Sequence, residues 1–160
     1  MAKQQHPEIR VRRAVSGDLN TLVEFNAAMA WETEGKTLDP ARLRAGVAAV
    51  LEQDALGFYL VAERSGRVVG QLLVTTEWSD WRNGIFWWIQ SVYVEAGHRR
   101  LGVYRTLHSH LQAEARRRDN VCGLRLYVDR DNHVARQVYG SLGMRDAHYD
   151  MLEIDFVLVR

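Results

Sequence analysis

The chain has 160 residues, a formal net charge of +1 and a single cysteine, Cys122. This length suits one domain, residues 1–160, that buries most of its apolar surface in a single core. The small net charge gives no reason to expect nucleic acid or a membrane as a partner, and one cysteine excludes an internal disulfide and a multi-cysteine metal site. No secretory leader and no run of about 20 apolar residues is visible, so we expect a cytoplasmic protein.

Hydrophobic periodicity and turn residues predict alternating strands and helices along the chain. A first strand at 9–14 precedes two helices, one running from Ser16 or Asp18 to about Trp31 and one from Pro40 to about Gln53, for which Asp39 is the expected N-cap. Further strands are expected at 58–63, 68–78, 85–94 and 123–128, with turns at Arg64–Arg67 and Asn83-Gly84. A helix at 132–142, ended by Gly143, and a last strand at 149–158 complete the order.

The stretch 85–118 organises the rest of the chain. Its first ten residues mix β-branched and aromatic side chains, as in a strand buried on both faces. From Leu101 onward, apolar residues at helical spacing predict a helix, with Gly102 at its entrance. A helix N-terminus offers unpaired backbone N–H groups, and glycine lets a diphosphate approach them closely. With Arg99 and Arg100 beside it, this turn is either an anion cradle or an ordinary connection with solvated arginines.

Two motifs, in the right order and spacing, resemble the GNAT N-acyltransferase superfamily. The first is Val92-x-Val94 followed by Arg99-x-x-Gly102 at the start of a helix. The second is Asn132-x-x-Ala135…Tyr139, closed by Gly143 and Met144. The resemblance implies an α/β (α+β) GNAT fold: a mixed, mostly antiparallel central sheet, flanked by helices, in which strands four and five splay apart and acetyl-CoA lies in the gap.

The resemblance also implies which residues bind the co-substrate acetyl-CoA (coenzyme A). Backbone groups of strand four would hold the pantetheine arm, and those of the following turn the diphosphate. The matching positions are Val92, Tyr93, Val94, Arg99, Arg100, Leu101, Gly102, Val103 and Tyr104, with Asn132 as both helix cap and cofactor contact. Tyr104 departs from the family, which usually has Gly or Ala there, and its register with Leu107 and Leu111 favours packing into the core.

Tyr139 matches the tyrosine that protonates the departing thiolate in many relatives; the alternative is a core tyrosine beside Val134, Val138 and Leu142. Relatives often carry a carboxylate on strand four, where this chain has Ile89-Gln90-Ser91. Gln90 does not accept a proton at neutral pH, but it can orient a water that does. Glu32, Glu34, Glu77 and Asp80 are other carboxylates that such a water could reach.

Five tryptophans stand out, four of them in 78–88 and the fifth at Trp31. Some of them pack under helices, whereas Trp31, Trp78 and Trp88, together with Glu32 and Glu34, could form an aromatic and acidic pocket for a cationic amine. Five histidines are expected at the surface, without metal-ligand spacing, so no metal is expected: His98, His108, His110, His133 and His148.

These observations predict an N-acetyltransferase that moves an acetyl group from acetyl-CoA to a primary amine, small and cationic or on a protein, by direct attack in a ternary complex. The alternative is a non-catalytic acyl-CoA-binding or interaction module on the same fold. A nucleic-acid-binding helix is disfavoured, because the arginines of 99–118 cluster at its ends and are offset by Glu114 and Asp119. The sequence leaves open whether the protein forms a homodimer.

Overall fold

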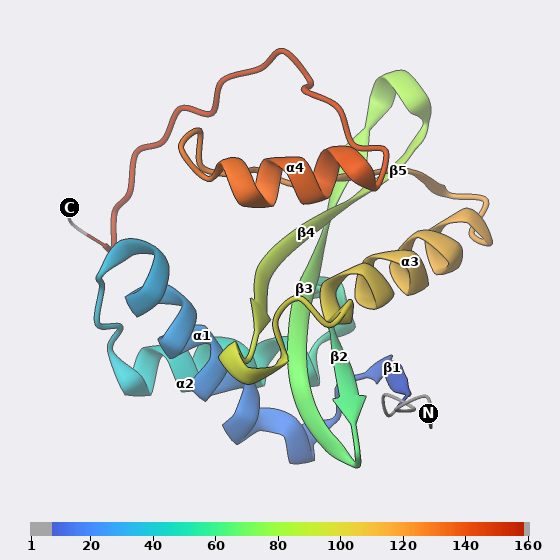
Figure 1. Cartoon of the computed structure of the whole chain (residues 1–160). Helices are drawn as coiled ribbons and strands as arrows, with labels where there is room; N and C mark the ends of the chain where they lie inside the picture. The colour runs from blue at the N-terminus through green and yellow to red at the C-terminus, as the bar shows by residue number, and fades with distance from the viewer. Residues whose placement is uncertain (1–7, 159–160) are drawn as a thin grey trace, which may run out of the picture. The chain divides into compact units, whose positions relative to one another are not determined.

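The computed structural model describes residues 8–158 and follows the expected order of elements as far as the helix at 132–142 (Figure 1). The elements are β1 (Ile9–Arg13), α1 (Leu19–Glu34), α2 (Pro40–Glu52), β2 (Phe58–Arg64), β3 (Arg67–Ser79), β4 (Gly84–Val94), α3 (Val103–Arg116), β5 (Val121–Arg125) and α4 (His133–Ser141). The chain forms two compact units that divide after Tyr127, so the expectation of one domain stays a prediction.

The first unit holds a five-stranded sheet in the order β1-β2-β3-β4-β5. All neighbouring strands are antiparallel except β4 and β5, which are parallel. The hairpin between β2 and β3 turns at Ser65-Gly66, both with positive φ, and the one between β3 and β4 turns at Asn83 with φ 45°. The predicted mixed, mostly antiparallel sheet is therefore confirmed.

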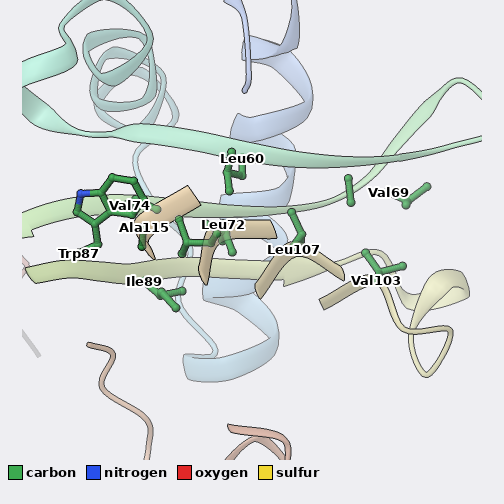
Figure 2. Close-up of a cluster of buried hydrophobic side chains, with 11 residues drawn as sticks. Leu60, Val69, Leu72, Val74, Trp87, Ile89, Val103, Leu107 and Ala115 are labelled. Atoms are coloured by element: carbon green, nitrogen blue, oxygen red, sulfur yellow. The ribbon is translucent and has the colours of Figure 1, made fainter. Parts of the chain in front are cut away.

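Helices cover both faces of this sheet. On one face, α3 contributes Val103, Leu107, Leu111 and Ala115 to a core that also holds inward side chains of β2, β3 and β4; Figure 2 shows this cluster. On the other face, Leu22 of α1 and Val47 of α2 pack against Tyr59 and Val61 of β2. Neighbouring residues of β4 on opposite faces are buried, since Phe86, Trp87 and Ile89 all have little exposed surface.

The helix ends follow local signals. Asp39 caps α2 by accepting a hydrogen bond from the N–H of Arg42 (2.7 Å), as predicted. Gly35, with φ 62°, ends α1 by donating its N–H to the carbonyl of Trp31 (3.0 Å). Asp18 stands at the N-cap of α1, but its carboxylate turns back to Arg12 and to the N–H of Val15 instead of capping the helix.

Three sequence expectations about the elements are wrong. The helix expected from Leu101 begins at Val103, because Arg100 (φ 63°) and Gly102 (φ 83°) hold left-handed backbone before it. The strand expected at 123–128 is Val121–Arg125, since its pairing with β4 starts at Ile85–Val121 and ends at Trp88–Arg125. The strand expected at 149–158 is absent: within the described chain, this segment has no ladder partner and its apolar side chains are exposed.

One histidine also lies elsewhere than predicted. His108 is 2% exposed, on the α3 face that meets the sheet, rather than at the surface. Burial lowers the pKa of its imidazole, so the neutral form is favoured there. The helical period that buries Leu107 and Leu111 turns position 108 inward as well.

Candidate active site

Strands β4 and β5 run together for only part of their length. The β4–β5 ladder ends at Trp88–Arg125, whereas the pairing of β4 with β3 continues to Val94–Gly70. Within the described part of the chain, residues 89–94 of β4 therefore have a strand neighbour on one side only. Backbone N–H and C=O groups on such an edge are strong hydrogen-bonding groups that an extended, peptide-like molecule can pair with.

A β-bulge marks the point where β4 bends. Ser91 has φ 48°, and the β3–β4 register shifts between Gln71 and Leu73. The fully buried side chain of Gln71 donates its amide Nε2–H to the carbonyl of Ser91 (3.1 Å). This hydrogen bond satisfies the carbonyl that the bulge removes from the ladder and so holds the bend in place.

The turn after β4 leads into the N-terminus of α3. The first internal hydrogen bond of this helix runs from the N–H of Thr106 to the carbonyl of Gly102 (2.9 Å), so the preceding N–H groups belong to the open first turn. A Cβ on Gly102 would meet nothing within 4 Å, which leaves the turn open on that side. A Cβ on Gly70 would lie 2.9 Å from Val103, so glycine there lets α3 begin close to the sheet. This end of α3 is a suitable place for an anion.

The first arginine of this turn is held by its neighbours. The guanidinium of Arg99 donates to the carbonyl of Val94 (2.8 Å) and to the carboxylate of Glu32 on α1 (2.5 Å), and it lies 5.5 Å from the ring centre of Tyr93. The hydroxyl of Tyr93 also donates to Glu32 (3.1 Å). Burial is the larger cause that raises the pKa of the Tyr93 hydroxyl, and the Glu32 carboxylate raises it further. The end of α1 is thereby tied to the end of β4 and the turn.

The remaining residues of the turn divide between solvent and core. Arg100, Leu101 and Gly102 are exposed, whereas Val103 is buried. The ring of Tyr104 packs against the α3 core, as its register predicted, and its centre lies 6.0 Å from that of His108. Its bulk therefore does not occupy the open side of the turn.

A polar and aromatic cluster lies on the sheet face opposite α3, across β3, β4 and β5. Glu77 accepts hydrogen bonds from Trp88 Nε1 (3.2 Å) and from Arg125 (2.5 Å). The ring of Tyr127 lies 5.9 Å from that of Trp88. We call these four residues, together with Gln90, the sheet-face cluster.

Gln90 is fixed at both ends of its amide. Its Nε2 donates to Thr75 Oγ1 (2.5 Å) and its Oε1 accepts from the hydroxyl of Tyr127 (3.4 Å). Because Trp88 and Gln90 are two residues apart on β4, they share one face. A glutamine held in this way can orient a small molecule or a water beside it, as the sequence analysis proposed for Gln90.

The residues predicted to form an acceptor pocket lie in different places. Trp31 and Glu34 are exposed at the end of α1, where Glu34 pairs with Lys36 (2.5 Å). Glu32 pairs with Arg99, and Trp88 belongs to the sheet-face cluster. Trp78 pairs in register with Ile85, on the α3 face, so it points away from Trp88. The structure thus does not bring these five residues together.

The second motif belongs to the second unit. Asn132 caps α4, accepting a hydrogen bond from the N–H of Ala135 (3.0 Å). Tyr139 lies on α4, and burial raises the pKa of its hydroxyl above the ordinary value for tyrosine. Arg136 of α4 pairs with Asp146 (2.9 Å), which follows this helix in the chain. The cap role predicted for Asn132 is confirmed.

Three further observations concern the described chain outside these clusters. A cavity of about 630 Å³ lies among Arg13, Asp54, Phe58, Trp87 and Glu114, and none of the predicted site residues line it. Among residues 8–158, no three side chains of the His, Cys, Asp or Glu type gather as metal ligands. In the same residues, no helix has both the length and the apolar content to span a membrane.

The acetyltransferase (GNAT) family model matches residues 23–144, which include the β4 edge, the Gly102 turn and Tyr139. The chain belongs to the GNAT family. The comparison with curated proteins found no match.

Solved structures agree with the GNAT fold. A possible acetyltransferase from Clostridium difficile 630 is 42% identical, with a TM-score of 0.87, over 94% of this chain and 99% of its own. A predicted acetyltransferase from Clostridium acetobutylicum, solved with acetyl-CoA, is 20% identical, with a TM-score of 0.73, over 92% and 96%. An aminoglycoside N-acetyltransferase in complex with CoA is 12% identical, with a TM-score of 0.75, over 98% and 100%. The last two show similarity of fold alone.

Sequence reasoning missed several residues of this candidate site. In the sequence, Gln71 is one polar residue within an otherwise apolar expected strand. Arg125 and Tyr127 lie in the expected strand at 123–128, with no sign of a functional role. Glu77 was named only as one of several carboxylates. The alternation of β3 and β4 around Asn83-Gly84 contained a usable signal, because pairing outward from this turn puts Glu77 beside Phe86 and Thr75 beside Trp88.

Proposed function

We propose that this GNAT protein is an N-acetyltransferase that moves an acetyl group from acetyl-CoA to a primary amine by direct attack. The observation that carries the proposal is the divergence of β4 from β5 directly before the Gly102 turn. The unpaired edge of β4 suits the amide groups of a pantetheine arm, and the first turn of α3 suits a diphosphate. The solved relatives with acetyl-CoA and CoA support this co-substrate.

In this proposal, the co-substrate contacts are mainly backbone groups. Val92, Tyr93 and Val94 would bind the pantetheine arm, and the N–H groups from Leu101 to Tyr104 the diphosphate. Arg100, which is exposed in the turn, would add charge. Arg99 already pairs with Glu32, so a phosphate would have to share or replace that partner. Asn132 is proposed as a further contact on the strength of the family motif.

We assign the acceptor amine to the sheet-face cluster. Its carboxylate, Glu77, pairs with Arg125 but has lone pairs that can also accept a hydrogen bond from an amine, and the rings of Trp88 and Tyr127 suit the carbon atoms and charge of such a substrate. Both a small amine and a flexible protein amine fit this chemistry. Among the relatives of the same fold, one is named for aminoglycosides, which are cationic amines.

The reaction needs a neutral amine and a protonated leaving group. The amine nitrogen attacks the thioester carbonyl carbon, a C–N bond forms, and the C–S bond then breaks. The amine gives its proton to a water oriented by Gln90, and this water passes a proton on to the Glu77 carboxylate on the same face of the sheet. Tyr139 gives its hydroxyl proton to the CoA thiolate; its raised pKa keeps that proton in place at neutral pH.

The test is a thiol-release assay with acetyl-CoA and a panel of primary amines, comparing wild type with Tyr139→Phe. General acid catalysis is worth about 10²–10⁴-fold, so the turnover number should fall in that range while CoA affinity changes little. Tyr149→Phe is the matched control, since it removes an exposed tyrosine hydroxyl in the same unit and should leave turnover unchanged.

The outcomes separate the enzyme from the alternative module. Full turnover in Tyr139→Phe would remove this tyrosine from the chemistry and leave water as the proton donor. Tight CoA binding with no thiol release on any amine would favour a non-catalytic acyl-CoA-binding module. That module is the second candidate because β4 carries Gln90, not a carboxylate, beside the proposed reaction site.

A further inference from the structure

The cavity of about 630 Å³ lies at the C-terminal end of α3, away from the Gly102 turn. All of its lining residues, from Arg13 to Val121, belong to the first unit of the chain. Because α3 has 14 residues, its two ends are about 20 Å apart. Figure 2 shows the same separation, with Trp87 and Val103 at opposite ends of the α3 core. A small molecule fits a cavity of this volume, and it would not overlap the proposed acetyl-CoA site.

Two arginines of the lining share one carboxylate. Arg13 and Arg118 both donate to Oε1 of Glu114, Arg118 over 3.0 Å. Within residues 8–158, Glu114 is the carboxylate partner of both, and Asp54, the other acid of the lining, pairs with neither. The side chains of Arg13 and Arg118 are 40% and 50% exposed, whereas that of Glu114 is 23% exposed. This trio therefore has an excess of positive charge, and its cations are the groups that a ligand can reach.

Aromatic rings adjoin both guanidinium groups. The guanidinium of Arg13 lies 3.1 Å from the ring centre of Phe58, and that of Arg118 lies 5.4 Å from the ring centre of Trp87. The two rings meet edge to face, with their centres 5.2 Å apart. Further apolar side chains of the lining are Val50, Leu51, Ile85 and Val121. A ligand that pairs with the arginines would therefore have apolar surface beside it.

We propose that this cavity binds a small organic carboxylate with an aromatic body. A guanidinium group offers a planar fork of N–H donors that fits a carboxylate, and one oxygen of Glu114 leaves part of each fork available. A second carboxylate would also balance the excess positive charge. The aromatic body would lie against the apolar part of the lining, near Phe58 and Trp87. A cationic ligand is disfavoured, because the exposed charges of the trio are the arginines.

Titration of naphthoate into the isotope-labelled, full-length protein, followed by the NMR signals of backbone amides and indole N–H groups, tests this site. The signals that move should centre on Phe58, Trp87 and Glu114, and those of the Gly102 turn should stay in place. Naphthamide has nearly the same shape without the charge, so it should bind at least about tenfold more weakly. The titration needs no acetyl-CoA, so its outcome does not depend on the proposed function.

Two substitutions should change the affinity for naphthoate in opposite directions. Arg118→Gln removes one guanidinium and should weaken binding about three- to tenfold, since the side chain is half exposed. Glu114→Gln removes the carboxylate that competes for both arginines and should tighten binding. Arg117→Gln is the matched control, because Arg117 is exposed next to Arg118 but does not line the cavity, and it should leave the affinity unchanged.

Shifts at the cavity, together with weaker binding in Arg118→Gln, support the proposal. The same spectra show that each variant is folded, and Arg118 is exposed, so its replacement leaves the core intact. The proposal is overturned if millimolar naphthoate leaves the signals of Phe58 and Trp87 in place. It is also overturned if naphthamide binds as tightly as naphthoate, or if Arg118→Gln binds naphthoate as tightly as wild type does.

Discussion

At the scale of single residues, the side chains around the turn have several partners each. Arg99 contacts the Val94 carbonyl, the Glu32 carboxylate and the Tyr93 ring, so its position depends on α1 as well as on its own turn. Glu32 was predicted as an acceptor contact, but its charge is already balanced by Arg99. A sequence names such residues without giving their partners, because Glu32 and Arg99 are 67 positions apart.

The interactions of the Asp18 carboxylate lead us to expect that the free energy of unfolding falls in acid. It accepts hydrogen bonds from Arg12 (2.7 and 3.0 Å) and from the N–H of Val15 (2.8 Å), and the hydrogen bond from Arg12 lowers its pKa. A pKa that is lower in the folded state stabilises the fold above the unfolded value of about 3.9. That contribution is lost as the pH falls through the folded-state pKa.

Asp18→Asn should therefore destabilise the protein by about 1–3 kcal/mol near neutral pH, because it leaves Arg12 with a weaker partner. It should also flatten the loss of stability below about pH 4. Urea unfolding at a series of pH values measures both effects. Asp119→Asn, at an exposed position, is the control. An unchanged pH dependence in Asp18→Asn would show that this carboxylate does not carry the acid sensitivity.

At the scale of elements, the ends of helices were predictable where one residue acts through its own backbone neighbours. Asp39-Pro40 specified the start of α2 and Asn132 the start of α4, because each cap needs only a carboxylate or amide oxygen three residues before its donor. The start of α3 was misplaced, since left-handed φ at Arg100 is not visible in a residue that usually favours right-handed helix.

The cap on α2 gives a prediction at this scale. Asp39→Ala removes the acceptor of the Arg42 N–H and should lower the free energy of unfolding by about 0.5–2 kcal/mol. Asp39→Asn keeps an oxygen in the same place and should change it much less. Chemical unfolding of both variants, with equal dependence on denaturant, measures the difference. Equal losses in the two would mean that charge, not the cap hydrogen bond, stabilises this end.

Strand boundaries and pairing were harder to predict than helix ends. The Asn83-Gly84 hairpin follows from two residues, but the length of β5 depends on where β4 diverges from it, which is set by long-range packing. The apolar alternation at 149–158 was interpreted as a strand of the same sheet, yet it forms no ladder in the described chain. Alternation shows that a segment can form a strand with one dry face, but not which edge it joins.

At the scale of the whole molecule, the fold and the co-substrate class followed from two motifs, whereas the acceptor did not. The motifs lie in β4 with α3 and in α4, and the family model covers both. The sheet-face cluster gathers Glu77, Trp88 and Arg125 from three strands. No spacing in one chain predicts such a gathering, which explains why the sequence did not single out this set of acidic and aromatic residues.

The central claim is that acetyl-CoA binds at the edge of β4 and the Gly102 turn. The most direct test is calorimetric titration of acetyl-CoA into wild type, Gly102→Asp and Gly102→Asn. Both substitutions meet open space and share the strain of a left-handed φ of 83°, so they differ mainly in charge. Gly102→Asp should weaken binding at least tenfold, or roughly 1.4 kcal/mol, and Gly102→Asn much less. Equal affinity in wild type and a folded Gly102→Asp protein would contradict the claim.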